Sequence, residues 1–112
     1  MPYFVVEYSY TAETTAGRDT HRAAHRAWLA DLVDTGTVIT CGPYGNDAGA
    51  FIIVNADTTE TVRALFADDP FAVHGLVPDQ RILHWTPVLG NLDASDAISQ
   101  AELSSRPGGS HS

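Results

Sequence analysis

Hydrophobic positions in the first third of the chain follow a strand repeat and then a helix repeat. Residues 3–10 are mostly β-branched or aromatic, and alternate side chains share a face, which predicts a strand. A loop is expected at residues 11–17. A helical repeat follows from about residue 18 or 19 to residue 35, and Gly36 is suited to end this helix.

Two short strands are predicted next. Residues 37–41 form the second strand, which Gly42-Pro43 should end. Residues 44–48 contain a Gly-Asn-Asp turn signal, and residues 49–55 form the third strand.

The last third of the chain predicts a second helix and a fourth strand. Asp57 or Thr58 caps the helix, and Pro70 ends it because the residue before a proline disfavours the α conformation. One short helical turn is expected at 71–75 and a strand at 80–88.

The order β-α-β-β-α-β predicts an α+β fold, the ferredoxin-like two-layer sandwich with helices on one sheet face. Residues 1–88 should form this domain, and 89–112 a C-terminal tail that is partly helical near 93–103 or disordered. The third strand is apolar on both faces, yet helices cover only one of them. We therefore expect a homodimer that packs through the sheet face, with a folded-back tail as the alternative cover.

Composition narrows the class of partner. Of the 112 residues 44% are hydrophobic and 18% charged, and acids outnumber bases 14 to 6 for a net charge of −8. Such a balance argues against nucleic acid or an anionic membrane as partner. The single cysteine, Cys41, excludes an internal disulfide and a cysteine-based zinc site. With no signal-peptide pattern or membrane-length apolar run, a cytoplasmic protein is expected.

Two histidines and two arginines lie in the first turns of the long predicted helix. A projection at about 100° per residue centres the apolar stripe of this helix close to His25. The stripe also contains Trp28, Leu29, Leu32 and Val33. Arg22 lies at the edge of the stripe, whereas Arg26 and Ala30 lie away from it.

A neutral imidazole on a buried face can accept or give a proton near pH 7, so His25 is a candidate acid–base residue. Arg22 is a candidate for binding an anionic substrate group. The alternative for His25 is a hydrogen-bonded core residue. A metal held by His21 and His25 has allowed spacing, but no third ligand is evident, so no metal is predicted.

Four motifs in order resemble the YciI-related, or YCII-domain, proteins. They are "RAAHRAWL" at 22–29, "CGPYGNDAGAFIIV" at 41–54, "ADDPFAVHGLV" at 67–77 and "ILHW" at 82–85. The resemblance covers roughly residues 3–88. It implies a dimeric α+β barrel and a His–Asp pair in a cleft, which fall on His25 and Asp69 here.

An Asp69 carboxylate bonded to the imidazole would fix the tautomer of the ring, although aspartate before proline is also an ordinary turn residue. Tyr8 or Tyr10 could donate to a substrate oxygen. The other candidates for contact with a substrate are Gly42, Pro43, Phe71 and His74.

The function expected is a cofactor-independent enzyme that transfers a proton on a small cyclic or phenolic substrate, in elimination, isomerisation or cyclisation. The resemblance includes dehydrochlorinases of chlorinated hydroxyhydroquinones, and a fold shared with muconolactone isomerase-like enzymes. The alternatives are a non-catalytic small-molecule-binding dimer and a cofactor-free monooxygenase. A role in aromatic degradation or secondary metabolism would fit the first reading.

Overall fold

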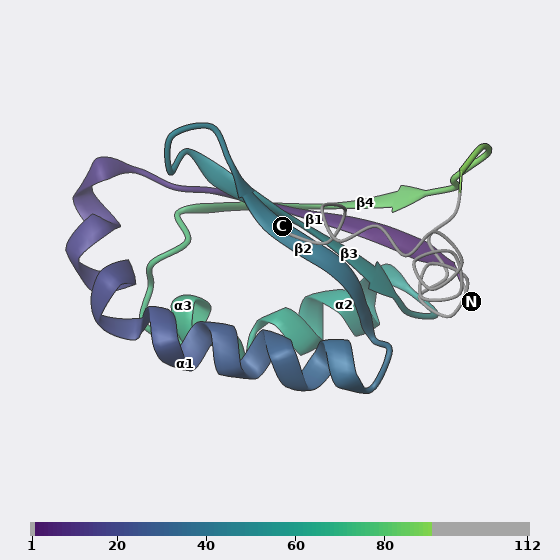
Figure 1. Cartoon of the computed structure of the whole chain (residues 1–112), viewed down its shortest axis with the longest axis horizontal. Helices are drawn as coiled ribbons and strands as arrows, with labels where there is room; N and C mark the ends of the chain where they lie inside the picture. Colours follow the sequence, from purple (N-terminus) through teal and green to yellow (C-terminus); the bar gives the residue numbers. More distant parts are fainter. Residues whose placement is uncertain (1, 91–112) are drawn as a thin grey trace, which may run out of the picture.

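Four antiparallel strands and the helices between them make up the computed structural model, which describes residues 2–90. The elements are β1 (Tyr3–Ser9), η1 (Ala12–Thr14), α1 (Thr15–Asp34), β2 (Val38–Tyr44), β3 (Gly49–Asn55), α2 (Thr59–Phe66), α3 (Pro70–Val73) and β4 (Asp79–Trp85). The strand order is β2-β3-β1-β4. The predicted ferredoxin-like α+β plan is confirmed, with the three helices together on one side of the sheet (Figure 1).

The register explains which side chains form the core. Val6 lies opposite Ile52 on one side and Ile82 on the other, so all three point to the helices. Val6 and Ile52 are buried there with Phe66 of α2. The opposite sheet face remains partly apolar and exposed, with Phe51 46% exposed.

The start of the long helix was predicted too late. It begins at Thr15 and is preceded by a turn of 3-10 helix, where a loop was expected. Gly17 lies inside this helix. A Cβ atom at this position would lie 2.5 Å from a Leu76 methyl group, so glycine allows Leu76 to pack closely against the helix. Arg18 then anchors the turn by donating to the Thr11 carbonyl oxygen at 3.1 Å.

The ends of two strands also differ from the prediction. β2 continues through Gly42 and Pro43 to Tyr44, because β2 is an edge strand where a missing N–H is tolerated. β4 ends at Trp85 instead of residue 88, because Trp85 pairs with Tyr3, the first residue of β1.

The other boundaries agree with expectation. Gly36 follows α1 with a positive φ of 82°, as predicted for a residue that ends a helix. The Thr58 side chain caps α2 by accepting from the Thr61 N–H. The short helical turn lies at Pro70–Val73, slightly before the predicted 71–75. The helical piece expected at 93–103 lies outside the described residues.

Candidate active site

α1 and α3 bring one imidazole and one carboxylate together against the sheet. His25 Nδ1 lies 2.8 Å from Asp69 Oδ1, although 44 residues separate the two along the chain. Asp69 is fully buried and His25 is 8% exposed. The aspartate caps α3 by accepting from the Phe71 N–H at 2.9 Å, and Pro70 fixes the first helical position after it.

Three donors converge on the buried Asp69 carboxyl group. Besides the Phe71 N–H and His25, the Tyr8 hydroxyl donates to Oδ2 at 2.6 Å. Burial first, and then the Asp69 charge and hydrogen bond, raise the pKa of Tyr8 well above its ordinary value, so Tyr8 keeps its proton. Since Asp69 is surrounded by donors, the carboxylate acts as acceptor toward Nδ1 as well.

The hydrogen bond to Asp69 selects the tautomer of the neutral His25 ring. When Nδ1 carries the proton toward Asp69, the lone pair of a neutral imidazole is on Nε2. Within residues 2–90, Nε2 has no hydrogen-bond partner. It is also not one of the fully buried unpartnered side-chain atoms, which are Arg18 Nε and Asn55 Oδ1. The nitrogen that could exchange a proton is therefore not completely buried.

Phe71 covers one face of the imidazole. The two rings stack at 3.8 Å between centroids with 3° between planes. Phe71 also lines a cavity beside this pair, whereas His25 itself is not part of its lining. The histidine thus lies behind Phe71 and is separated from the cavity on that face.

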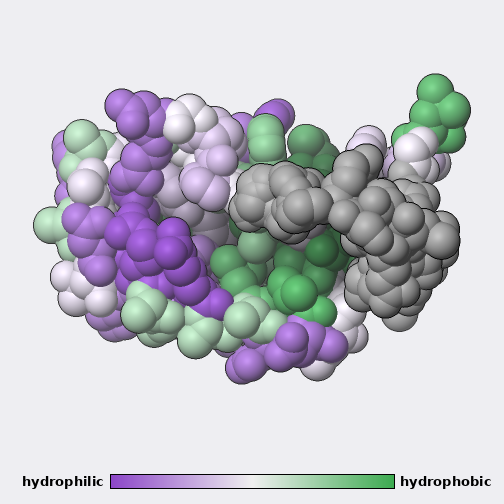
Figure 2. Space-filling view, in the orientation of Figure 1, coloured by the Kyte–Doolittle hydropathy of each residue, from purple (hydrophilic) through white to green (hydrophobic). Residues whose placement is uncertain are grey.

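The cavity lies between α1 and the β2–β3 edge of the sheet and has a volume of about 740 Å³. Its walls carry Tyr10, Arg22, Arg26, Leu29, Ala30, Val33, Cys41, Gly42, Pro43, Gly45, Asp47, Ala50, Ile52 and Phe71. Hydrophobic residues gather in the middle of this side of the molecule, next to hydrophilic residues near the start of α1 (Figure 2). This size is ordinary for a small-molecule site.

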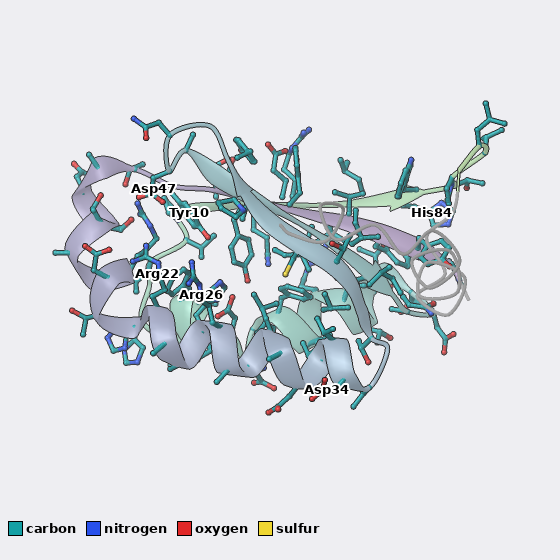
Figure 3. All side chains as sticks on the ribbon, viewed as in Figure 1. Tyr10, Arg22, Arg26, Asp34, Asp47 and His84 are labelled. Atoms are coloured by element: carbon teal, nitrogen blue, oxygen red, sulfur yellow. The ribbon has the colours of Figure 1, made fainter. Side chains whose placement is uncertain are left out.

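α1 uses two adjacent faces. Most of the predicted apolar stripe around His25 packs on the core, but Val33 was wrongly predicted to be buried and is 44% exposed. A second stripe, turned by about a quarter of a circle and including Leu29 and Val33, lines the cavity. Arg26 and Ala30, which we predicted to lie away from the buried stripe, belong to this second stripe. Arg22 and Arg26 both point from α1 toward the side where Tyr10 and Asp47 lie (Figure 3).

Tyr10 is the hydroxyl group that faces the cavity. Its pKa is raised to about 12, first by burial and then by the Asp69 charge, with Arg18 and Arg22 opposing the increase. The Arg18 guanidinium lies 4.2 Å from the Tyr10 ring centroid and 2.7 Å from Asp47. Tyr10 is therefore a neutral phenol at pH 7 and can donate a hydrogen bond to a bound oxygen.

Four residues predicted to contact substrate line this cavity: Arg22, Gly42, Pro43 and Phe71. Two others lie elsewhere. Tyr8 is fully buried and bonded to Asp69, so it supports the pair instead of facing a ligand. His74 is exposed, stacks on His21 at 3.7 Å between ring centroids and is not part of the cavity lining.

Cys41 also lines the cavity, where burial raises the pKa of its thiol, so it is neutral at pH 7. Over the described residues, no three His, Cys, Asp or Glu side chains are close enough to hold a metal ion. In the same range no helix has the length and apolarity to cross a membrane.

The chain combines a ferredoxin-like α+β fold with a buried histidine–aspartate pair beside a cavity. A family model for the YCII-related domain matches residues 1–86. The chain therefore belongs to the YCII-related family, as the sequence motifs suggested. No functionally curated protein matches it in a sequence comparison.

Among solved structures, the chain is similar to 5-chloro-2-hydroxyhydroquinone dehydrochlorinase (TftG) from Burkholderia phenoliruptrix AC1100, in complex with 2,5-dihydroxybenzoquinone. The TM-score is 0.68 at 23% identity, over 77% of this chain and 95% of that chain. At this identity the similarity establishes a shared fold.

Proposed function

We propose that this protein is a cofactor-independent enzyme in which His25, oriented by Asp69, transfers a proton on a small cyclic or phenolic substrate. The observation that carries the proposal is the 2.8 Å contact between His25 Nδ1 and the buried Asp69 carboxylate, beside a cavity of small-molecule size. The similar structure, by its name, belongs to a dehydrochlorinase of a chlorinated hydroquinone, which supports this class of reaction on this fold.

The chemistry assigns one role to each group. Nε2 of His25 takes a proton from a C–H or O–H of the substrate, and the electron pair left behind moves into the ring of the substrate. Asp69 stabilises the imidazolium that results. The Tyr10 hydroxyl donates to the substrate oxygen on which negative charge develops.

The fate of the electron pair decides the product. In an elimination, the pair expels an anionic leaving group such as chloride, and His25 later loses the proton to solvent. In an isomerisation, His25 returns the proton to another atom of the same substrate. Both outcomes balance without a redox partner.

Turnover by a histidine variant tests this function. Chlorinated hydroxyhydroquinones are incubated with the protein in D₂O, and chloride release and deuterium uptake into substrate are measured. His25→Ala should lose about 10²–10⁴-fold in rate, the usual contribution of an acid–base residue. His84→Ala is the matched control, since His84 is exposed at the opposite end of the molecule (Figure 3). Equal activity in the two variants would refute the assignment.

One observation favours a second candidate, a non-catalytic small-molecule-binding protein. Phe71 stacks flat on His25 and lies between much of the ring and the cavity. In that case the cavity binds a metabolite unchanged, and His25→Ala retains the binding.

We also propose that the sheet face away from the helices is covered by a second copy of the chain. Its exposed large hydrophobic side chains are Phe51, Leu83 and Trp85. Light scattering should show a dimer for the wild type and a monomer for Phe51→Asp. Val73→Asp, at a more exposed hydrophobic site on α3, should leave the dimer intact. A monomeric wild type would contradict the proposal.

A further inference from the structure

The stripe of α1 that lines the cavity changes character along its length. Arg22 and Arg26 lie at the beginning, and Leu29, Ala30 and Val33 follow toward the end of the helix. At 1.5 Å per residue, the distance along the helix axis from Arg26 to Val33 is about 10 Å. One end of the cavity is therefore basic and the other apolar.

The two arginines differ in what binds them. Arg22 forms an ion pair with Asp19, one turn earlier on the same helix. Arg26 forms no ion pair with any residue in the range 2–90. The carboxylate on the opposite wall, Asp47, is paired with the buried Arg18 at 2.7 Å. Arg26 thus presents an uncompensated guanidinium to a cavity whose other walls are largely apolar.

The apolar end is open as well. Val33 is 44% exposed, and across from it β2 and β3 contribute Cys41, Pro43 and Ile52 to the opposite wall. Covering this solvent-exposed apolar surface with an apolar ligand removes it from water, which lowers the free energy and favours binding.

We propose that the cavity binds an amphipathic organic anion. Arg26 binds a carboxylate or ionised phenol group of the ligand, and an apolar body about 10 Å long, the size of a fused aromatic ring system, lies toward Val33. This inference rests on the proposed function and deepens it, because it names the substrate class and makes Arg26 a specificity-determining residue. Arg26 directly follows His25 on α1, so an anion at Arg26 would lie at the end of the cavity near the histidine–aspartate pair.

Two dyes that differ only in charge test the inference. 8-Anilinonaphthalene-1-sulfonate has an aromatic body with an anionic group, and N-phenyl-1-naphthylamine has the same body without it. Each is titrated into the full chain, and Kd is taken from the amide shifts of Ala30 and Gly42, which report on the cavity itself. The wild type should prefer the anionic dye.

In Arg26→Gln, the anionic dye should bind about tenfold more weakly, while the neutral dye keeps its affinity. Arg63→Gln on α2, an exposed arginine outside the cavity, is the matched control and should change neither dye. Val33→Asp should weaken both dyes. Equal changes for the two dyes in Arg26→Gln, or no change at all, would overturn the proposal.

The same titration separates this inference from the proposed function. His25→Ala should keep the preference for the anionic dye, because binding needs no proton transfer. If Arg26→Gln has no selective effect while His25→Ala abolishes turnover, the substrate class is wrong and the acid–base assignment stands. If Arg26→Gln selectively weakens the anionic dye and His25→Ala stays active, the substrate class stands and the acid–base assignment is wrong.

Discussion

Two carboxylates on opposite sides of the sheet have partners of the same kind, namely one tyrosine hydroxyl and one nitrogen-containing side chain. Asp69 accepts from the Tyr8 hydroxyl and contacts His25, whereas Glu7 accepts from the Tyr44 hydroxyl at 2.8 Å and from Arg81 at 2.7 Å. Glu7 and Tyr8 are neighbours on β1, so their side chains point to opposite faces.

The difference between the two clusters is burial and the nature of the base. The side chains of Asp69 and His25 are 0% and 10% exposed, whereas those of Glu7 and Arg81 are 17% and 61% exposed. A guanidinium keeps its charge at every relevant pH, but an imidazole gains and loses a proton near neutrality. The helix-side cluster can therefore move a proton beside a cavity, and the open-face cluster can only hold a charge.

Removal of the buried carboxylate should have the largest effect. Asp69→Ala leaves the Tyr8 hydroxyl and the Phe71 N–H without an acceptor, which should lower the free energy of unfolding by about 3 kcal/mol. Asp68→Ala, an exposed neighbour, should change it by less than about 0.5 kcal/mol. Urea unfolding of both variants measures the difference. Similar losses would show that Asp69 is an ordinary turn residue.

Removal of one hydroxyl from each cluster should sharpen the comparison. Tyr8→Phe deletes the 2.6 Å bond to Asp69 and should destabilise the fold by about 1–2 kcal/mol, because the bond is buried and its acceptor is charged. Tyr44→Phe deletes the bond to Glu7 on the exposed face. Its thermal midpoint should fall by less than that of Tyr8→Phe, and the opposite order would argue against burial as the deciding factor.

The smallest effect is expected for Glu7→Gln, and it should depend on pH. The hydrogen bond from Arg81, and then that from Tyr44, lower the pKa of Glu7 below its ordinary 4.5. A lowered pKa contributes stability above the unfolded value, and that stability is lost as the pH falls through the folded value. The difference in thermal midpoint between wild type and variant should therefore be present at pH 7 and shrink as the pH falls through the lowered pKa of Glu7. A difference that grows on acidification would contradict this sign.

Periodicity predicted most of the fold because each element buries one face. It misplaced the ends of those helices and strands whose boundaries depend on contacts between residues distant in the sequence. α1 starts earlier than expected, in a turn whose Arg18 is paired with the distant Asp47, and the edge position of β2 lets Pro43 remain in the strand. The length of β4 depends on its partner, since β1 starts at Tyr3.

The candidate site was only partly predictable. The helical repeat pointed to His25, but Asp69 came from the family resemblance, because spacing alone cannot pair residues 44 positions apart. Tyr8 was predicted as a possible donor to a substrate oxygen, but strand alternation could not show that its hydroxyl donates to Asp69 instead. Arg26 was missed as a cavity residue because a helical projection separates buried from exposed faces and does not show a hollow beside the helix.

The protonation of the His25 ring tests the central claim most directly and requires no substrate. A long-range proton–nitrogen correlation spectrum of the histidine side chains near pH 7.5 distinguishes the two neutral tautomers. With Nδ1 donating to Asp69, Nδ1 should carry the proton and Nε2 should show the shift of a bare nitrogen, and Asp69→Asn should remove this preference. A proton on Nε2 in the wild type would mean that the nitrogen facing the substrate is not a base.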